Sequence, residues 1–294
     1  MTVTLKIPSV DDMPTVIAVM ASWQSDGAPV QLHPGDLGWA WRFGASSVAE
    51  AVRVWSRDGE IAAVGFLDGP DVVRMAVAPA GDRDAEFARL VVNDLEGPPS
   101  EMFPAGELSV EARYGEALRT ELGECGWGAG EPWAPLVRDL SGPVEPVALR
   151  IETLSAESAA PALIEDRVAV HLASFPNPRP MTAEHWQAMA AGPAYRRARC
   201  VIAYDDRDVA VAATTAWSAG PGRPGLIEPL GVHRDHRGHG YGVAITHAAA
   251  AVLQELGSSS VSVATPSSNQ PAVATYRSAG FAAEPEDRDF QRPR

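Results

Sequence analysis

The apolar residues of the chain fall into short strand-like runs and longer helical stripes. Five runs have the length and composition of strands: 61–69, 71–79, 199–204, 209–217 and 225–232. Helical patterns precede these runs in each half, at 9–23 and 155–175. Another helix is expected after residue 242, where six apolar residues recur at helical spacing before Gly257 supplies a stop: Val243, Ile245, Ala248, Ala249, Val252 and Leu256. The pattern predicts a mixed α/β protein.

The two halves of the chain resemble each other in layout. The tripeptide LKI at 5–7 precedes the first helical pattern, and LRI at 149–151 precedes the second. Strand-like runs follow in the same order in both halves. A turn-rich segment, SGPVEP at 141–146, lies between them. We therefore expect two domains, 1–146 and 147–294.

Charge is distributed unevenly between these halves. The 294 residues include 24 Lys and Arg against 38 Asp and Glu, a net charge of −14. Residues 1–145 hold 10 basic and 23 acidic side chains, whereas residues 146–294 hold 14 and 15. This balance disfavours nucleic-acid binding, which needs a basic face. The acidic first half would suit a cationic partner, and it would equally serve solubility.

The remaining bulk features predict a cytoplasmic protein without membrane association. No apolar run is long enough to span a bilayer, and the first residues lack the basic and apolar regions of a secretory signal. The two cysteines, Cys125 and Cys200, lie in different halves without the spacing of a metal or redox motif. We expect both to be core thiols rather than a disulfide.

The segment GVHRDHRGHGYG, residues 231–242, is the strongest candidate for chemistry. A strand runs into this glycine-rich turn and a helix leaves it, so backbone NH groups and the positive end of the helix dipole converge there. Glycines let an anion approach the main chain, and Arg237 with Arg234 adds positive charge. A pyrophosphate is the most obvious ligand. Neither a Walker A loop nor the GxGxxG fingerprint matches.

A metal site is not favoured in this segment. His233, His236 and His239 lie close together in one turn. Zinc sites usually recruit ligands from separate elements. We therefore expect no bound metal.

Two motifs in the second half resemble those of one family. Arg237-Gly-His-Gly-Tyr-Gly242 is similar to the Arg/Gln-x-x-Gly-x-Gly/Ala loop of the GNAT family of N-acetyltransferases. The segment 269–281, NQPAVATYRSAGF, is similar to that family's second signature, Asn-x-x-Ala-x-x-x-Tyr-x-x-x-Gly-Phe. The first half matches only in layout, so the chain resembles a tandem member of the family, similar in layout to mycothiol synthase.

The resemblance implies a fold and a cofactor. The fold would be two tandem GNAT-like domains, each with a mixed, mostly antiparallel sheet flanked by helices. The second would bind acetyl-CoA through Leu230, Gly231, Val232, Arg237, Gly238, His239, Gly240, Tyr241, Gly242, Asn269 and Tyr276. The first has one glycine and two carboxylates in the matching loop, residues 77–84, where a pyrophosphate would be repelled. We expect that first domain to bind no cofactor.

Two residues are candidates for catalysis. Glu228 lies four residues before Val232 and could take a proton from an amine substrate; regular pairing would place its side chain on the face of Leu230 and Val232. It could instead bind substrate or be solvated. Pro229 predicts a bulge in this strand. By the resemblance, Tyr276 would protonate the departing thiolate; a core aromatic residue is the alternative.

Other residues carry less information about function. Asn269 precedes Pro271 and could cap a helix, bind cofactor or do both. His171, His185 and His247 lie in helical segments without evident partners. Aromatic residues in GDLGWAW, 35–41, are expected in the core and could contribute to a substrate cleft.

The reaction expected from this pattern is transfer of acetyl from acetyl-CoA to a primary amine of a small molecule, by direct attack in a ternary complex. A cationic antibiotic or amino sugar would agree with the acidic first half, and an amino-acid or peptide amine is an alternative acceptor. A non-catalytic acyl-CoA-binding or regulatory protein is the alternative of a different class. Such a protein would need neither Glu228 nor Tyr276.

Overall fold

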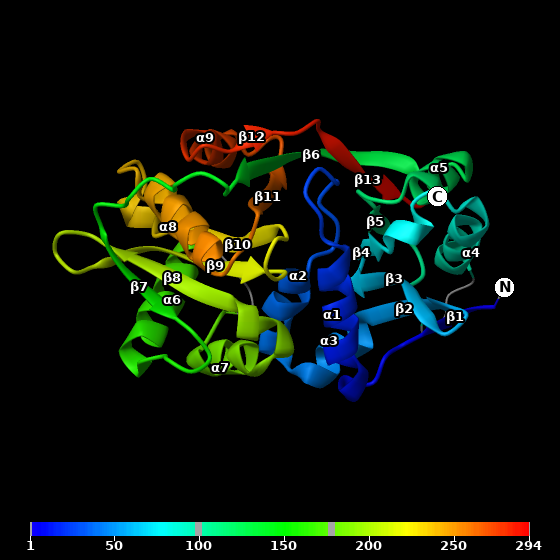
Figure 1. The fold of residues 1–294 in the computed structure, drawn as a ribbon, viewed down its shortest axis with the longest axis horizontal. Helices are drawn as coiled ribbons and strands as arrows, with labels where there is room; N and C mark the ends of the chain where they lie inside the picture. The colour runs from blue at the N-terminus through cyan, green and yellow to red at the C-terminus, as the bar shows by residue number, and fades with distance from the viewer. Residues whose placement is uncertain (1, 98–101, 176–179, 294) are drawn as a thin grey trace. The chain divides into compact units, whose positions relative to one another are not determined.

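The computed structural model describes residues 2–97, 102–175 and 180–293. The chain forms two compact units. Unit 1 comprises residues 1–34, 45–133 and 286–294, and unit 2 comprises residues 35–44 and 134–285. Each unit is a mixed, mostly antiparallel sheet with helices, which confirms the expected fold class. Figure 1 labels the elements.

Unit 1 is built on strands in the order β1-β2-β3-β4-β5-β13-β6. The strands are β1 (Val3–Lys6), β2 (Val52–Arg57), β3 (Glu60–Leu67), β4 (Val72–Val77), β5 (Ser109–Glu111), β13 (Asp287–Gln291) and the first part of β6 (Gly128–Asp139). The pair β4–β5 is parallel. The helices are α1 (Met13–Trp23), α3 (Ala45–Ala51), α4 (Ala85–Glu96) and α5 (Glu116–Glu124). Within the described residues, two short 3-10 helices complete the unit: η1 (Val10–Asp12) and η3 (Pro79–Gly81).

Unit 2 is built on strands in the order β6-β11-β10-β9-β8-β7. The strands are the second part of β6, β7 (Arg150–Leu154), β8 (Ala198–Tyr204), β9 (Ala210–Ser218), β10 (Gly225–Val232) and β11 (Ser260–Pro266), with β12 (Ala282–Ala283) paired to β6. The pair β10–β11 is parallel. The helical elements are α2 (Pro34–Ala40), η2 (Trp41–Phe43), α6 (Pro161–Ser174), α7 (Ala183–Ala191), η4 (Pro193–Arg197), η5 (Arg234–His236), α8 (Tyr241–Glu255) and α9 (Gln270–Ser278).

The two faces of the unit 2 sheet are covered by different helices. Alternate residues of β8 point to opposite faces. Val201 and Ala203 belong to the apolar core that contains the inner stripe of α8, whereas Cys200 accepts a hydrogen bond from Trp186 of α7. On that second face, α6 packs on β9 and β10. Strand β10 therefore lies between α8 and α6.

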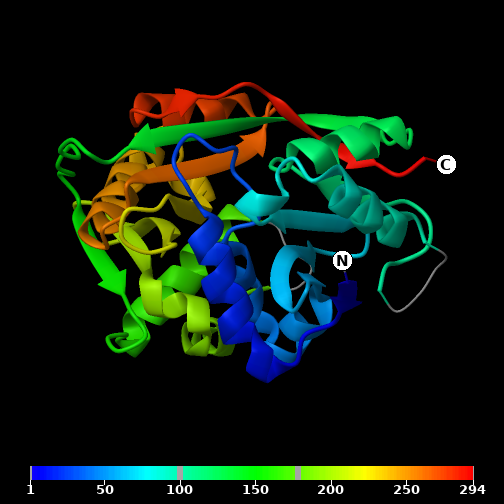
Figure 2. The same ribbon diagram turned by 45° about the vertical axis from the view of Figure 1, so that its right-hand side comes forward.

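The two compact units do not coincide with the two halves of the sequence, because each unit includes segments from both halves. Strand β6 contributes residues up to Trp133 to unit 1 and residues from Ala134 to unit 2; Figure 2 shows it as one long strand. The C-terminal strand β13 pairs with β5 and β6 of unit 1. Helix α2 and turn η2, from the first half, belong to unit 2. The domain limits 1–146 and 147–294 remain a proposal about the repeat, distinct from this grouping by contacts.

Candidate active site

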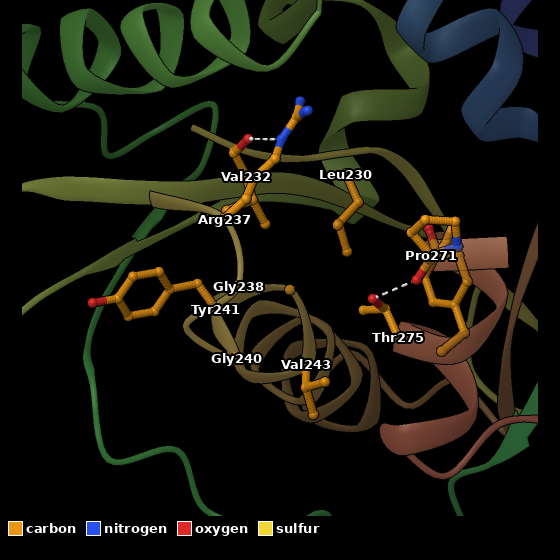
Figure 3. Close-up of a pocket in the computed structure, with 12 residues that line it drawn as sticks. Leu230, Val232, Arg237, Gly238, Gly240, Tyr241, Val243, Pro271 and Thr275 are labelled. Carbon is orange, nitrogen blue, oxygen red and sulfur yellow. Dashed lines mark hydrogen bonds between the residues drawn. The ribbon is translucent and has the colours of Figure 1, made fainter. Parts of the chain in front are cut away.

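A pocket of about 410 Å³ opens where β10 ends and α8 begins. Its walls come from three places: the end of β10, the glycine turn with the start of α8, and helix α9 (Figure 3). The lining residues are Leu230, Val232, Arg237, Gly238, Gly240, Tyr241, Gly242, Val243, Pro271, Ala272, Thr275 and Tyr276. Eight of these twelve were predicted from the sequence to bind a cofactor.

The glycines of the turn serve two different physical needs. Gly238 and Gly240 have φ angles of +81° and +79°, a backbone conformation that residues with a Cβ atom rarely adopt. A Cβ atom on Gly242 would lie 3.0 Å from Thr275 Cγ2, so this glycine allows α9 to approach α8. Gly240 is the N-cap residue of α8, and no side chain caps the first amides of that helix. These amides are thus available to an anion.

The arginines of the turn do not point at the glycines. Arg237 donates to the carbonyl oxygens of Ser174, at 3.1 Å, and Val232, at 3.5 Å (Figure 3). Arg234 donates to the carbonyls of Ala173 and Leu172. Both arginines therefore satisfy the last carbonyls of α6, where a positive charge is favourable. In this conformation the anion-binding groups of the turn are its backbone amides.

Strand β10 contains the bulge that Pro229 predicts. Ile227 pairs with Ala216 and Leu230 pairs with Thr214, so β10 carries one extra residue between the two pairs. The Glu228–Pro229 peptide bond is cis. The register shift makes the pairing irregular at Glu228, so the alternation that would have placed its side chain with Leu230 and Val232 does not apply.

Tyr276 and Glu228 nevertheless act on each other electrostatically. Burial raises the pKa of the Tyr276 hydroxyl to about 12, and the negative charge of Glu228 contributes to the rise. Tyr276 lines the pocket from α9 and its ring packs against Phe281 at 5.7 Å. The carboxylate on β10 therefore lies close enough to the phenol on α9 for its charge to act on it.

Trp217 holds the bulge from the α6 side of the sheet. Its indole N–H donates to the carbonyl oxygen of Glu228 at 2.7 Å, and the side chain is almost fully buried. Cβ atoms on Gly35 and Gly38 would lie 2.6 and 2.4 Å from Trp217, so α2 packs its bare backbone on the indole. Sequence analysis missed this role, because the relevant glycines lie about 180 residues away from Trp217.

Three predicted cofactor residues lie outside the described lining of the pocket: Gly231, His239 and Asn269. A Cβ atom on Gly231 would lie 2.6 Å from Ser174 Cβ, so this glycine lets β10 pack on α6. Asn269 is the N-cap of α9, accepting from Ala272 N at 3.4 Å and donating to Thr265 at 3.2 Å. Capping was one of the two roles considered for it.

The histidines considered in the sequence analysis make contacts within the fold. The His239 ring stacks on Tyr241 with centroids 5.8 Å apart. His185 completes the capping box of α7 with Thr182, and His247 contacts Arg138 at 2.9 Å. Within residues 2–97, 102–175 and 180–293, no group of three or more side chains is arranged to hold a metal ion.

Both cysteines are free thiols. Cys200 is fully buried beside Trp186 and Thr215, whereas Cys125 is half-buried. Burial and three nearby carboxylates raise the pKa of the Cys125 thiol, which makes it a poor nucleophile. In the part of the chain that the structure describes, no helix is long and apolar enough to cross a bilayer.

The matching loop of unit 1 is closed by its own carboxylates. Asp84 caps α4 by accepting from Phe87 N at 3.0 Å, and it also pairs with Arg57. Asp82 accepts from Glu116 N at 3.0 Å. The amide that a phosphate would use at this helix is thus already occupied by a side chain.

Comparison with protein families identifies the second half of the chain. The model of the acetyltransferase (GNAT) family matches residues 163–281, which contain every residue of the pocket. These residues are therefore similar to the GNAT family over the length of one domain. This match supports N-acetyltransferase activity in the second half of the chain, as the two sequence motifs had indicated. A comparison with curated proteins finds no match.

Solved structures extend the GNAT fold to the whole chain. A tandem GNAT protein from the clavulanic acid biosynthesis pathway is 15% identical with a TM-score of 0.57, over 99% of this chain and 98% of its own. A GCN5-related N-acetyltransferase from Sphaerobacter thermophilus is 20% identical with a TM-score of 0.54, over 99% and 95%. A GNAT acetyltransferase from Colwellia psychrerythraea is 12% identical with a TM-score of 0.61, over 99% and 98%. The expected tandem layout is confirmed.

Proposed function

We propose that the protein transfers the acetyl group of acetyl-CoA to a primary amine of a small molecule, by direct attack in a ternary complex. The observation that carries the proposal is the convergence of three features in unit 2. An anion-binding turn, an apolar-walled pocket and a carboxylate–phenol pair meet at the end of β10. Separately, none of these features requires acyl transfer.

The pocket has the chemical groups that coenzyme A needs. The uncapped first amides of α8, next to Gly238 and Gly240, suit the pyrophosphate. Leu230 and Val243 form apolar walls for the pantetheine arm. When bound, the thioester supplies an activated acetyl group; the protein's task is to place the amine and manage two protons.

We assign the two protons to Glu228 and Tyr276. The acceptor amine is protonated near neutral pH, so Glu228 accepts its proton directly or through water. The amine nitrogen then bonds to the acetyl carbon, and the carbon–sulfur bond breaks. Tyr276 donates its proton to the departing sulfur and regains one from the nitrogen, which still carries an extra proton after the new bond forms. Glu228 releases the first proton to solvent, so the products are the N-acetyl amine and the free thiol of coenzyme A.

The interaction between the two residues helps this sequence of steps. A phenol whose pKa is about 12 is fully protonated at neutral pH, yet it is a weaker acid than an ordinary thiol. Part of the rise comes from the charge of Glu228. When Glu228 takes the proton of the amine, that charge disappears and the pKa of Tyr276 falls. Removing the first proton thus makes Tyr276 a better donor for the second.

The decisive experiment measures thiol release from acetyl-CoA across a panel of amines, with wild type, Tyr276→Phe and Glu228→Gln. We expect each substitution to lower kcat by about 10²–10⁴-fold. The Kd of acetyl-CoA, measured by calorimetry, should change little. Uptake of acetyl-CoA without turnover of any amine would instead support the alternative of a non-catalytic acyl-CoA-binding protein. Full turnover by both variants would remove the two assignments.

A further inference from the structure

Helix α6 carries a buried arginine with two unpartnered nitrogen atoms. Arg167 is 1% exposed, and its Nε and Nη2 atoms have no hydrogen-bond partner among the residues that the structure describes. None of the ion pairs within that part of the chain involves it. A buried cation without a counter-charge is costly, because it has lost water and gained nothing in exchange.

The two unpartnered nitrogens have a specific geometry. Nε and Nη2 lie on the same edge of the planar guanidinium group, and their N–H bonds are parallel. This edge is the one that binds a carboxylate through two parallel hydrogen bonds. The missing partner therefore has the shape of a carboxylate rather than of a single acceptor.

The two acids next to Arg167 in the sequence do not fill this position. Glu165 is exposed, and Asp166 accepts a hydrogen bond from the Tyr204 hydroxyl at 2.7 Å. One turn along the same buried face of α6 lies His171, 5% exposed, whose Nδ1 is also without a partner. Burial and the charges of Arg167 and Arg42 lower the pKa of His171 to about 3, so its ring is neutral and adds no charge.

The cluster is connected to the main chain of Glu228 through two buried aromatic residues. The charge of Arg167 acts on the Tyr195 hydroxyl, the Tyr195 ring contacts Trp217 at 5.7 Å, and Trp217 donates to the Glu228 carbonyl. Further along α6, Ser174 and Phe175 pack against Gly231 at the other side of the bulge. The buried face of α6 therefore spans the bulge of β10.

The aromatic rings around His171 form the remaining wall. Trp39 of α2 lies 5.4 Å from the His171 ring, and Phe175 lies 5.0 Å from it on another side. Both rings are only half-buried. Apolar rings therefore flank the cluster, and an ion pair enclosed beside them would be strengthened because water is excluded.

We propose that Arg167 binds a carboxylate of the acceptor, so that the substrates are amines that also carry a carboxylate, as amino acids do. The proposal rests on the acetyl transfer proposed above and defines its acceptor. The amine of such a substrate faces Glu228, and its carboxylate takes the free edge of Arg167. Arg167 is thus a specificity-determining residue, and no bond changes at it.

The test compares each amino acid with its carboxamide, which keeps size and shape but removes the charge. Thiol release is measured for glycine, alanine, leucine and phenylalanine and for their amides. At least one acid should exceed its amide about 100-fold or more in kcat/KM, because the amide leaves the buried cation unpaired. Amides that match every acid would overturn the proposal. Failure of every amine, with no acetyl-CoA bound, would instead refute the proposed function.

Two variants separate binding from folding. Arg167→Met fills the same space without the charge and should lower kcat/KM for the preferred acid about 100-fold, leaving the amide and the Kd of acetyl-CoA unchanged. Arg196→Met, at an exposed arginine of the same unit, is the matched control and should change neither. In thermal unfolding, the preferred acid should raise the Tm of wild type and not that of Arg167→Met. An equal rise of Tm in wild type and in Arg167→Met would contradict the proposal. If the variant does not fold, the comparison of acids with amides in the wild-type protein still tests the proposal.

Discussion

Replacing Trp217 with phenylalanine tests whether the bulge of β10 is held in place by one hydrogen bond. The substitution removes the N–H that donates to the Glu228 carbonyl at 2.7 Å and leaves the aromatic ring against Tyr195. The carbonyl loses its partner, which costs about 1–3 kcal/mol. The smaller ring also leaves space beneath Gly35 and Gly38, which adds about 1 kcal/mol. We expect the free energy of unfolding to fall by about 2–4 kcal/mol.

The effect on catalysis separates positioning from general stability. Freed from Trp217, the Glu228 main chain can shift, and misplacement of a reacting group by about 1 Å costs up to 10²-fold in rate. Thiol-release assays should show kcat lowered about 10- to 100-fold, with the KM for acetyl-CoA unchanged, because Trp217 does not line the cofactor pocket. The pH at which kcat reaches half its maximum should also shift, since the environment of the base changes.

The chain offers a matched control for this experiment. Trp186 is also buried, and its ring meets the same Tyr195 edge-to-face at 5.8 Å, but its N–H donates to Cys200 Sγ. Trp186→Phe should lower the free energy of unfolding comparably in urea titrations and leave kcat and its pH profile unchanged. Equal losses of kcat in the two variants, measured well below their Tm, would refute the positioning role of Trp217.

Three further predictions concern other parts of the molecule. Burial, and to a lesser extent the charge of Glu111, raises the pKa of Asp289 to about 6, above its usual value. The protonated carboxyl therefore contributes its full stability below about pH 4, and this contribution is lost as pH rises through 6. Asp289→Asn should leave the unfolding free energy at pH 4 unchanged and raise it by about 1 kcal/mol at pH 7.5, after allowance for partial exposure; parallel urea curves at both pH values would show the pKa to be ordinary. Calorimetry should find one acetyl-CoA per chain, because Asp84 occupies the matching helix end in unit 1, and a value near two would contradict that reasoning. Gly231→Ala should destabilise the protein by about 1–3 kcal/mol through its contact with Ser174, and adding Ser174→Gly should restore part of the loss; absence of any restoration would mean that the strain lies elsewhere.

The parts of the site that sequence analysis predicted are those encoded by neighbouring residues. The glycine turn, the helix after it and the bulge at Pro229 each depend on the conformational preferences of a few adjacent positions. These features could be predicted because local backbone preference and the final fold agree.

The parts that were missed depend on pairings between distant segments. Strands β12 and β13 have two and five residues, and the run EPEDRDF around β13 is too charged to indicate a strand. They form because β6 offers them a partner. Arg167 gave no signal, because an arginine within a helical pattern is usually solvated. Only the packing of α6 on the sheet shows that this one is enclosed.

The long strand β6 and the exchanged segments bear on how such a protein can evolve. A copy of the second half cut at the joint 141–146 would lose the strand that flanks β11, and with it helix α2, on which Trp217 rests. The first half cut there would lose β13. Neither fragment could therefore be moved into another gene as a self-sufficient domain. Each half supplies strands or helices that complete the unit of the other half, so we expect neither half to fold without the other.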